Sequence, residues 1–185
     1  MKAIFGGNFN PVHTGHLIQA IEALNLLSLE KILFIPAWKA PLKEEIISVP
    51  FEDRYNMLKL ATSNIRYFEV LKLESKRKGI SYSYDTIKEL LKKEKELCLL
   101  IGEDQAINFT EWNEWQKILK IIDVFVLKRS KKKRKYLQEL KPLNTRIIEI
   151  SSTEIRNKIK KGDPVDFLIP EKVLSYIKEH NLYKT

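Results

Sequence analysis

The sequence contains little cysteine, little histidine and no long hydrophobic run. One cysteine, Cys98, in 185 residues excludes an internal disulfide, and its apolar neighbours indicate an inert buried thiol. No apolar run approaches the roughly 20 residues of a membrane-spanning helix, and the chain enters a strand-like run without a charged leader. We therefore expect a cytoplasmic protein with no membrane partner.

Acidic residues are outnumbered by basic ones. The chain has 24 Asp and Glu against 33 Lys and Arg, which gives a net charge of +9. Much of the excess lies in residues 128–135, a run without interleaved aromatics that could stack on nucleic-acid bases. We interpret this run as a solvated loop and expect no nucleic-acid partner.

Short apolar runs recur along the chain and predict β-strands. Apolar stripes at helical spacing lie between most of them, as in residues 17–27, 55–62 and 87–91. Strands that alternate with helices predict a doubly wound α/β fold, with a mainly parallel sheet, helices on both faces and ligands at the carboxyl ends of the strands. The predicted strands are residues 3–5, 32–35, 67–71, 97–101, 124–127 and 147–150.

The C-terminal part has a different pattern. Residues 152–160 and 170–180 predict two helices, separated by a break at Gly162-Asp163-Pro164. The sequence has no internal repeat and no linker-like segment. We therefore expect a single domain over residues 1–185, with a small C-terminal helical part at about 151–185.

The most informative segment is residues 6–16, Gly-Gly-Asn-Phe-Asn-Pro-Val-His-Thr-Gly-His, directly after the first apolar run. Gly6 and Gly7 let the backbone approach a ligand closely and permit positive φ. His13 and His16 lie on one side if a helix begins between them, and its N-terminal N–H groups suit a phosphate chain. The alternatives are an ordinary strand-to-helix turn and a zinc site. No cysteine or acidic cluster nearby completes a zinc site. We therefore predict that the protein provides no metal ligand.

A second segment, residues 150–156, reads Ile-Ser-Ser-Thr-Glu-Ile-Arg and follows a predicted strand. Ser152 or Thr153 can cap a helix there and also offer N–H and O–H groups to a phosphate oxygen. Arg156 lies one turn further on and can reach the same anion with its planar guanidinium. By itself, this segment is more typical of an ordinary capped helix than of a phosphate site.

The two segments together resemble the nucleotidyltransferase superfamily. The first is similar to its T/HxGH signature, typically Gly-(Ser/Thr)-Phe-Asp-Pro-x-His-x-Gly-His, and the second to its Ile-Ser-Ser-Thr-x-Ile-Arg motif, which grips ATP phosphates. With the intervening segments 36–43, 51–58, 81–86, 101–104 and the tail 168–183, the chain resembles bacterial nicotinate-nucleotide adenylyltransferases over essentially its whole length. The resemblance implies a Rossmann-like nucleotidyltransferase fold. It also implies transfer of the adenylyl group of ATP to nicotinate mononucleotide, which yields deamido-NAD and pyrophosphate.

The resemblance also implies residue roles at the ATP phosphates. His13 and His16 contact the phosphates, with His16 stabilising the transition state, while Lys43 and Arg156 add positive charge. Mg²⁺ bridges phosphate oxygens and is held by the substrate and water, without protein ligands. The further ATP-binding residues that it implies are Gly6, Gly7, Phe9, Gly102, Asp104, Ser151, Ser152 and Thr153.

For the second substrate, the resemblance implies that Trp112 stacks on the pyridine ring, although core packing beside Phe109 is the alternative. Thr86, at a predicted helix start, would present N–H groups to the nicotinate carboxylate and favour the acid over the amide. Asn8 and Lys43 are the other implied substrate contacts.

Some positions depart from the family pattern or stay open. Asn10 stands where the family usually has Asp, and Leu42 stands where it usually has His, so any role of that imidazole is absent. Asp104 could instead be a helix N-cap. Arg54 could be a phosphate contact or a surface ion-pair partner.

Three other functions fit parts of the sequence. Phosphopantetheine adenylyltransferase and cytidylyltransferases share the first motif, but residues 81–86, Trp112 and the Leu-Tyr tail favour the nicotinate enzyme. A non-catalytic RNA-binding protein would use the +9 charge, but two intact phosphate motifs argue against it. A homo-oligomer is compatible with the sequence.

Overall fold

The fold is built on one parallel sheet. The computed structural model describes residues 1–39, 49–77, 79–80, 82–128, 130 and 134–184. Six strands lie in the order β3-β2-β1-β4-β5-β6, and every neighbouring pair is parallel. This order confirms the predicted doubly wound sheet, with the first strand next to the centre. The strands are β1 (Lys2–Gly7), β2 (Lys31–Pro36), β3 (Phe68–Val70), β4 (Leu97–Gly102), β5 (Asp123–Leu127) and β6 (Lys141–Leu143).

Two apolar clusters cover the two faces of the sheet. Alternate residues of β1 enter different clusters: Ala3 and Phe5 join the first and Ile4 the second. Residues of α1 (Thr14–Leu26), α2 (Phe51–Thr62), α7 (Ser152–Lys161) and α8 (Glu171–Glu179) belong to the first cluster. Residues of α4 (Ser83–Leu91), α5 (Glu103–Ile107), the 3-10 turn η1 (Phe109–Glu111) and α6 (Trp115–Ile121) belong to the second.

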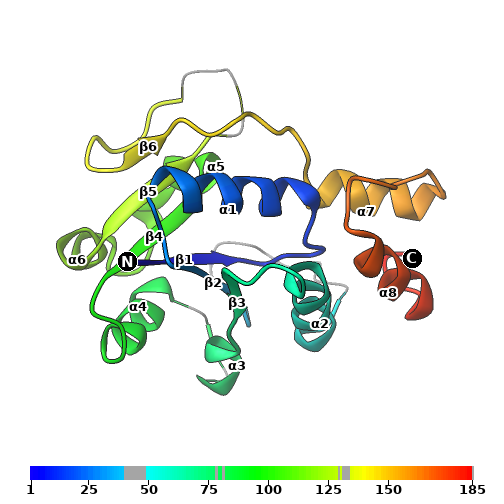
Figure 1. Ribbon diagram of the computed structural model, residues 1–185, viewed down its shortest axis with the longest axis horizontal. Coiled ribbons are helices and arrows are strands. Elements are labelled where there is room, and N and C mark those ends of the chain that lie inside the picture. Colours follow the sequence, from blue (N-terminus) through cyan, green and yellow to red (C-terminus); the bar gives the residue numbers. More distant parts are fainter. Residues whose placement is uncertain (40–48, 78, 81, 129, 131–133, 185) are drawn as a thin grey trace.

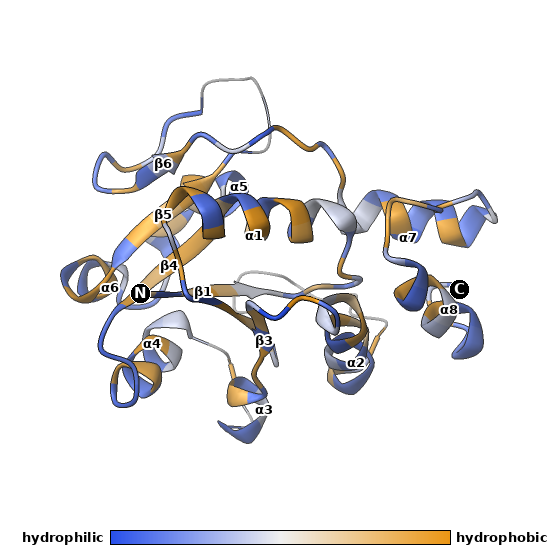
Figure 2. Ribbon diagram, viewed as in Figure 1, coloured by the Kyte–Doolittle hydropathy of each residue, from blue (hydrophilic) through white to orange (hydrophobic). Residues whose placement is uncertain are grey.

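The central strands are apolar on both sides because helices cover both faces of the sheet. Figure 2 shows β4 and β5 as almost continuously hydrophobic ribbons. Five of the six residues of β4 are buried. This double burial explains why the sequence shows continuous apolar runs instead of alternation.

The sixth strand is not where the apolar pattern predicted it. Residues 147–150 form no strand, and the edge position is taken by β6, which contains Pro142. A proline is tolerated there because an edge strand has one unpaired side. The apolar side chains of Ile148 and Ile150 instead line a cavity. The apolar pattern therefore did not predict strand pairing here, and it did not predict burial either, because Ile148 and Ile150 are only partly buried and Ile147 is exposed.

The C-terminal helices lie beside the start of α1. Figure 1 shows α7 and α8 at the opposite end of the molecule from the N-terminus, next to the first turn of α1. Gly162 ends α7 in the left-handed region, with φ of 77°. The predicted helices at residues 152–160 and 170–180 are thus confirmed, whereas the short helices α3 (Leu73–Arg77), α5 and α6 were not foreseen.

None of the helices in the described residues is both long and apolar enough to span a bilayer.

Candidate active site

A cavity of about 520 Å³ opens at the carboxyl ends of β1 and β4. These strands flank the point where the strand order reverses, which is where doubly wound sheets bind ligands. Of the site residues predicted from the sequence, Arg156 is not part of the lining, and Lys43 lies outside the described residues, as does Leu42. The predicted residues that line the cavity are Gly6, Gly7, Asn8, Phe9, His13, His16, Thr86, Gly102, Asp104, Trp112, Ser151, Ser152 and Thr153.

The two histidines form the N-terminal cap of α1. The His16 N–H donates to His13 Nδ1 at 3.3 Å, and the His13 N–H donates to His16 Nδ1 at 3.2 Å. Their rings stack with centroids 3.6 Å apart. Because each Nδ1 accepts a backbone hydrogen bond, a neutral ring carries its proton on Nε2. The pair therefore has the tautomer in which Nε2–H is the donor.

The histidine rings are held closely by their neighbours. The Phe9 ring packs edge-on against His16, with centroids 5.1 Å apart. A Cβ on Gly15 would lie 3.0 Å from His13 Nδ1, so the ring needs a glycine there. Gly6 and Gly7 lie in β1 and do not use the positive φ that glycine permits, whereas Phe9 takes the left-handed conformation, with φ of 46°.

The two sequence motifs meet in space. The Ser152 hydroxyl donates to the Pro11 carbonyl at 2.9 Å, and Arg156 Nη1 donates to the Asn10 carbonyl at 2.8 Å. Residues more than 140 positions apart in the chain are thereby joined. The helix starts of α1 and α7 consequently face the same cavity, and both direct positive potential toward it.

The second motif uses its hydroxyls differently from the expectation. The N-cap of α7 is Ser151, whose Oγ accepts from the Glu154 N–H at 3.1 Å, and not Ser152 or Thr153. The Ser152 hydroxyl instead donates to the Pro11 carbonyl of the first loop, and Thr153 Oγ1 accepts from Arg156 Nη2 at 3.2 Å. The sequence could not rank the three hydroxyls because each occupies a position that can cap a helix.

Arg54 is buried, so it is not a surface ion-pair partner, and it is not part of the cavity lining. Its side chain is only 1% exposed. Nη1 donates to the Asn8 carbonyl at 2.8 Å and Nη2 to the Trp38 carbonyl at 3.4 Å. The guanidinium also lies 5.6 Å from the centroid of the Phe51 ring. Arg54 therefore stabilises the first loop through its hydrogen bond to the Asn8 carbonyl.

The opposite side of the cavity contains a buried polar cluster that the sequence did not reveal. The Thr86 hydroxyl donates to Glu74 Oε1 at 3.0 Å and accepts from Arg77. Glu74 Oε2 also accepts from the Trp38 N–H at 3.4 Å. The Thr86 N–H itself donates to the Tyr82 carbonyl, so this N–H is not the carboxylate donor that we expected. Both Glu74 and Thr86 line the cavity.

Trp112 and Asp104 also line the cavity. The half-buried Trp112 ring lines it and also packs on Phe109, with centroids 5.1 Å apart, so the stacking and packing expectations are compatible. Asp104 is not an N-cap, because α5 begins after Gly102, which holds that position. Its carboxylate pairs with Arg134 Nη1 at 2.9 Å, and both side chains are well exposed.

The described residues contain no cluster of three or more His, Cys, Asp or Glu side chains that could hold a metal ion. Within the lining, both oxygens of Glu74 accept protein hydrogen bonds, and Asp104 pairs with an arginine. This donor set does not fit a cation held by the protein. It fits one held by ligand phosphates and water.

One residue near the site lies in the chain's last turn. The Tyr183 hydroxyl donates to Asn10 Oδ1 at 2.5 Å, and the ring is 6% exposed. Burial raises the pKa of Tyr183 far above its usual value, so the phenol stays a donor. Nothing local in the sequence indicates this contact, because the two residues lie 173 positions apart.

Comparisons with known proteins agree with this geometry. The sequence matches the family model described as cytidylyltransferase-like over residues 4–158. A Clostridium botulinum (strain Hall) protein named "Probable nicotinate-nucleotide adenylyltransferase" is 38% identical, covering 99% of this chain and 98% of that protein. A Methylacidiphilum infernorum protein of the same name is also 38% identical, covering 98% and 91%.

The fold is also that of a solved structure from another organism. Plasmodium falciparum nicotinic acid mononucleotide adenylyltransferase complexed with NaAD superposes with a TM-score of 0.80. The two sequences are 21% identical, over 98% of this chain and 96% of that one. At this identity the likeness establishes the fold, and the relatives above establish the family.

Proposed function

This chain belongs to the cytidylyltransferase-like family, among the nicotinate-nucleotide adenylyltransferases, and from that membership and the site we propose that it transfers the adenylyl group of ATP to nicotinate mononucleotide. The products are deamido-NAD and pyrophosphate. It is an enzyme of NAD biosynthesis in this proposal.

One observation carries the proposal. Two motifs from opposite ends of the chain are joined by the Ser152–Pro11 and Arg156–Asn10 hydrogen bonds at one cavity, beside a stacked pair of imidazoles. Two helix starts and two imidazoles that line one cavity suit a polyphosphate better than any neutral ligand.

The reaction needs positioning and charge stabilisation more than covalent help. A phosphate oxygen of the mononucleotide attacks the α-phosphorus of ATP, the bond from this phosphorus to the bridging oxygen breaks, and pyrophosphate leaves with the electron pair. In the proposal His13 and His16 donate from Nε2 to phosphate oxygens, and His16 stabilises the charge on the transferring group. Lys43 and Arg156 add positive charge, and the N–H groups at the start of α7 hold the outer phosphates.

A magnesium ion bound by the phosphates would neutralise part of their charge and keep the triphosphate in one conformation. The cavity supports this arrangement because its acidic side chains already have protein partners. The protein's contribution is then the imidazole pair and the amide-lined turns around the phosphates.

We assign the opposite side of the cavity to the mononucleotide. In the proposal Trp112 stacks on the pyridine and Asn8 contacts the mononucleotide, and both residues line the cavity. The start of α4 offers positive potential to a carboxylate, although Thr86 contributes through its hydroxyl network and not through its N–H. Gly102 and Asp104 remain the proposed ribose contacts of ATP.

We also propose that the chain works as one domain in the cytoplasm. The shared sheet beneath both apolar clusters supports a single domain. The lone cysteine supports a reducing compartment: burial raises the pKa of Cys98 to about 12, so the thiol is inert.

The decisive experiment measures pyrophosphate release with Mg²⁺, ATP and one of three acceptors. These are nicotinate mononucleotide, the corresponding amide and phosphopantetheine. We expect the highest kcat/KM with nicotinate mononucleotide and deamido-NAD as the product by mass spectrometry. A preference for phosphopantetheine would contradict the substrate assignment. No turnover, together with salt-dependent RNA binding that survives His16→Ala, would favour the RNA-binding alternative.

A further inference from the structure

The first loop of the site is held by side chains from three separate parts of the chain. Arg54 of α2 donates to the Asn8 carbonyl, and Arg156 of α7 donates to the Asn10 carbonyl. The Asn10 side chain has a partner of its own, because its Oδ1 accepts from the Tyr183 hydroxyl. Asn10 is 7% exposed, so water does not replace these partners easily.

The chain after α8 adopts a costly backbone conformation to bring this hydroxyl inward. Asn181 has φ of 51° and Tyr183 has φ of 64°, both in the left-handed region that non-glycine residues rarely occupy. For a bulky residue such as tyrosine this conformation is uncommon, and it persists only where the surroundings stabilise it. Here the stabilising features are burial of the ring in the first apolar cluster and the bond to Asn10.

We infer that Tyr183 is a positioning residue for the histidine pair. Its hydroxyl fixes the Asn10 side chain, and Asn10 and Pro11 set the path of the loop into His13, which caps α1. The chain's last turn thereby determines where the two Nε2 atoms point. This inference rests on the proposed adenylyl transfer for its kinetic consequence, but the geometric part stands without it.

Tyr176 provides a matched control on the adjoining helix. Its hydroxyl donates to Asp53 Oδ1 at 2.8 Å and accepts from Asn56 at 3.2 Å, both on α2 and outside the loop. Its ring stacks on His180, with centroids 3.9 Å apart. Tyr183→Phe and Tyr176→Phe therefore each remove one phenol hydroxyl from the C-terminal segment, but only the first removes a bond to the loop.

The kinetic test compares the two variants at saturating ATP and nicotinate mononucleotide. We expect Tyr183→Phe to lower kcat about tenfold with KM for ATP within about twofold, because displaced catalytic donors affect the transition state more than the ground state. Tyr176→Phe should keep kcat within about twofold. Equal kcat losses in both variants, or wild-type kcat in Tyr183→Phe, would overturn the inference.

A spectroscopic test does not depend on turnover. The chain has three histidines, so their imidazole resonances can be followed individually by NMR. Tyr183→Phe should move the His13 and His16 resonances and leave His180 in place, whereas Tyr176→Phe should leave His13 and His16 unchanged. A Tyr183→Phe spectrum that matches wild type at His13 and His16 would reject the positioning role.

A double-mutant cycle identifies the route of the effect. Asn10→Ala removes the acceptor, so Tyr183→Phe should cost no further kcat in that background. Asn10→Asp keeps an acceptor oxygen and should retain most of the activity. Additive losses would show that Tyr183 acts by another route.

The two proposals fail in distinguishable ways. If wild-type protein makes no deamido-NAD but the NMR shifts appear as expected, the positioning role stands and the proposed function falls. If wild-type protein is active and both variants behave alike, the proposed function stands and the positioning role falls.

Discussion

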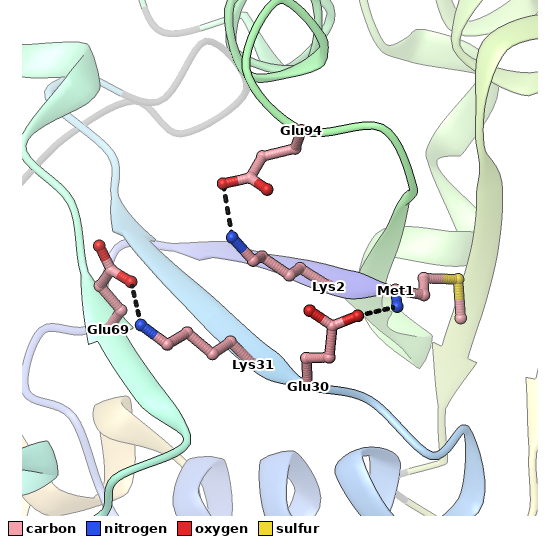
Figure 3. A network of polar contacts seen from close by, with 6 residues as sticks. All are labelled: Met1, Lys2, Glu30, Lys31, Glu69 and Glu94. Carbon is pink, nitrogen blue, oxygen red and sulfur yellow. Dashed lines mark hydrogen bonds and ion pairs between the residues drawn. The ribbon is translucent and has the colours of Figure 1, made fainter.

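The amino edge of the sheet, where the strands begin, and the carboxyl edge, where the strands end, contain different kinds of polar contact. At the amino edge, Lys2 pairs with Glu94 at 2.7 Å and Lys31 with Glu69 at 3.0 Å, and Figure 3 shows these pairs side by side. Both partners of the Lys31 pair are more than 40% exposed. At the carboxyl edge, by contrast, Arg54 is 1% exposed and donates to backbone carbonyls.

This difference indicates what each edge contributes. Exposed ion pairs gain little free energy because water and salt screen them, so the amino edge tolerates substitution. A buried donor to a backbone carbonyl leaves that carbonyl unsatisfied when the donor is lost. The carboxyl edge therefore does not tolerate such substitutions. Substitutions at the carboxyl edge should therefore lower both the free energy of unfolding and the activity more than substitutions at the amino edge do.

The largest effect should come from the carboxyl edge, at His16. His16→Ala removes the proposed transition-state donor and should lower kcat by about a hundredfold or more. The free energy of unfolding should fall by only about 1 kcal/mol, the usual cost of a lost cap contact. Steady-state kinetics and urea unfolding measure the two quantities. Near-normal turnover would remove His16 from the mechanism.

Arg54→Met should have the largest effect on stability. It preserves the apolar stem but leaves the Asn8 carbonyl without this donor, so the free energy of unfolding should fall by about 2–3 kcal/mol. Urea denaturation checks this value, and kcat should fall as well because the loop loses support. If the free energy of unfolding fell by less than about 0.5 kcal/mol, the buried contact would contribute no more than an exposed ion pair, which would contradict the comparison.

Gly15→Ala should separate activity from stability at the same edge. The added Cβ would lie 3.0 Å from His13 Nδ1 and displace that ring, so we expect kcat to fall about tenfold. Alanine favours the helix by up to about 1 kcal/mol, which offsets part of the strain. The melting temperature should therefore change little. Unchanged kcat would show that the ring position is not critical.

Lys31→Met is the counterpart of Arg54→Met at the amino edge. Its pair with Glu69 is exposed, so the free energy of unfolding should change by about 0.5 kcal/mol or less, and kcat should match wild type. Urea unfolding at low and at 1 M salt checks both the size and the screening. A loss as large as that of Arg54→Met would contradict the comparison.

The smallest effect should be a pH dependence of the N-terminal pair. The hydrogen bond to Glu30 raises the pKa of the Met1 ammonium above its usual 8.0, and the same contact lowers the pKa of Glu30 below 4.5. The ammonium contribution is therefore complete below about pH 8 and is lost as the pH rises through the raised pKa. The carboxylate contribution is complete above about pH 4.5 and is lost as the pH falls. Melting curves of wild type and Glu30→Gln should differ most between these limits.

The sequence predicted those features of the site that are local in the chain. The first loop, the helix starts and the strand runs lie within short segments whose residue types determine their structure. The doubly wound, mainly parallel sheet was predictable because β-strands that alternate with helices have few allowed connections. These features needed no knowledge of distant residues.

The sequence did not predict features that depend on distant partners. Residues 147–150 have a strand pattern, but pairing depends on which segment reaches the edge of the sheet. Glu74 lies in a polar stretch with no sign of burial, and the Tyr183–Asn10 bond spans nearly the whole chain. Such contacts appear only when the tertiary structure brings the partners together.

The reciprocal hydrogen bonds between the backbone and the imidazoles of the two histidines limit which substitutions this loop can accept. The Nδ1 atoms that fix the orientation of the two histidine rings also cap the start of α1. A lysine at either position would carry charge but offer no acceptor for the backbone, so the N-terminal cap of α1 would lose one of its two hydrogen bonds. Redesign of this enzyme's chemistry must therefore replace both imidazoles together, as one structural unit.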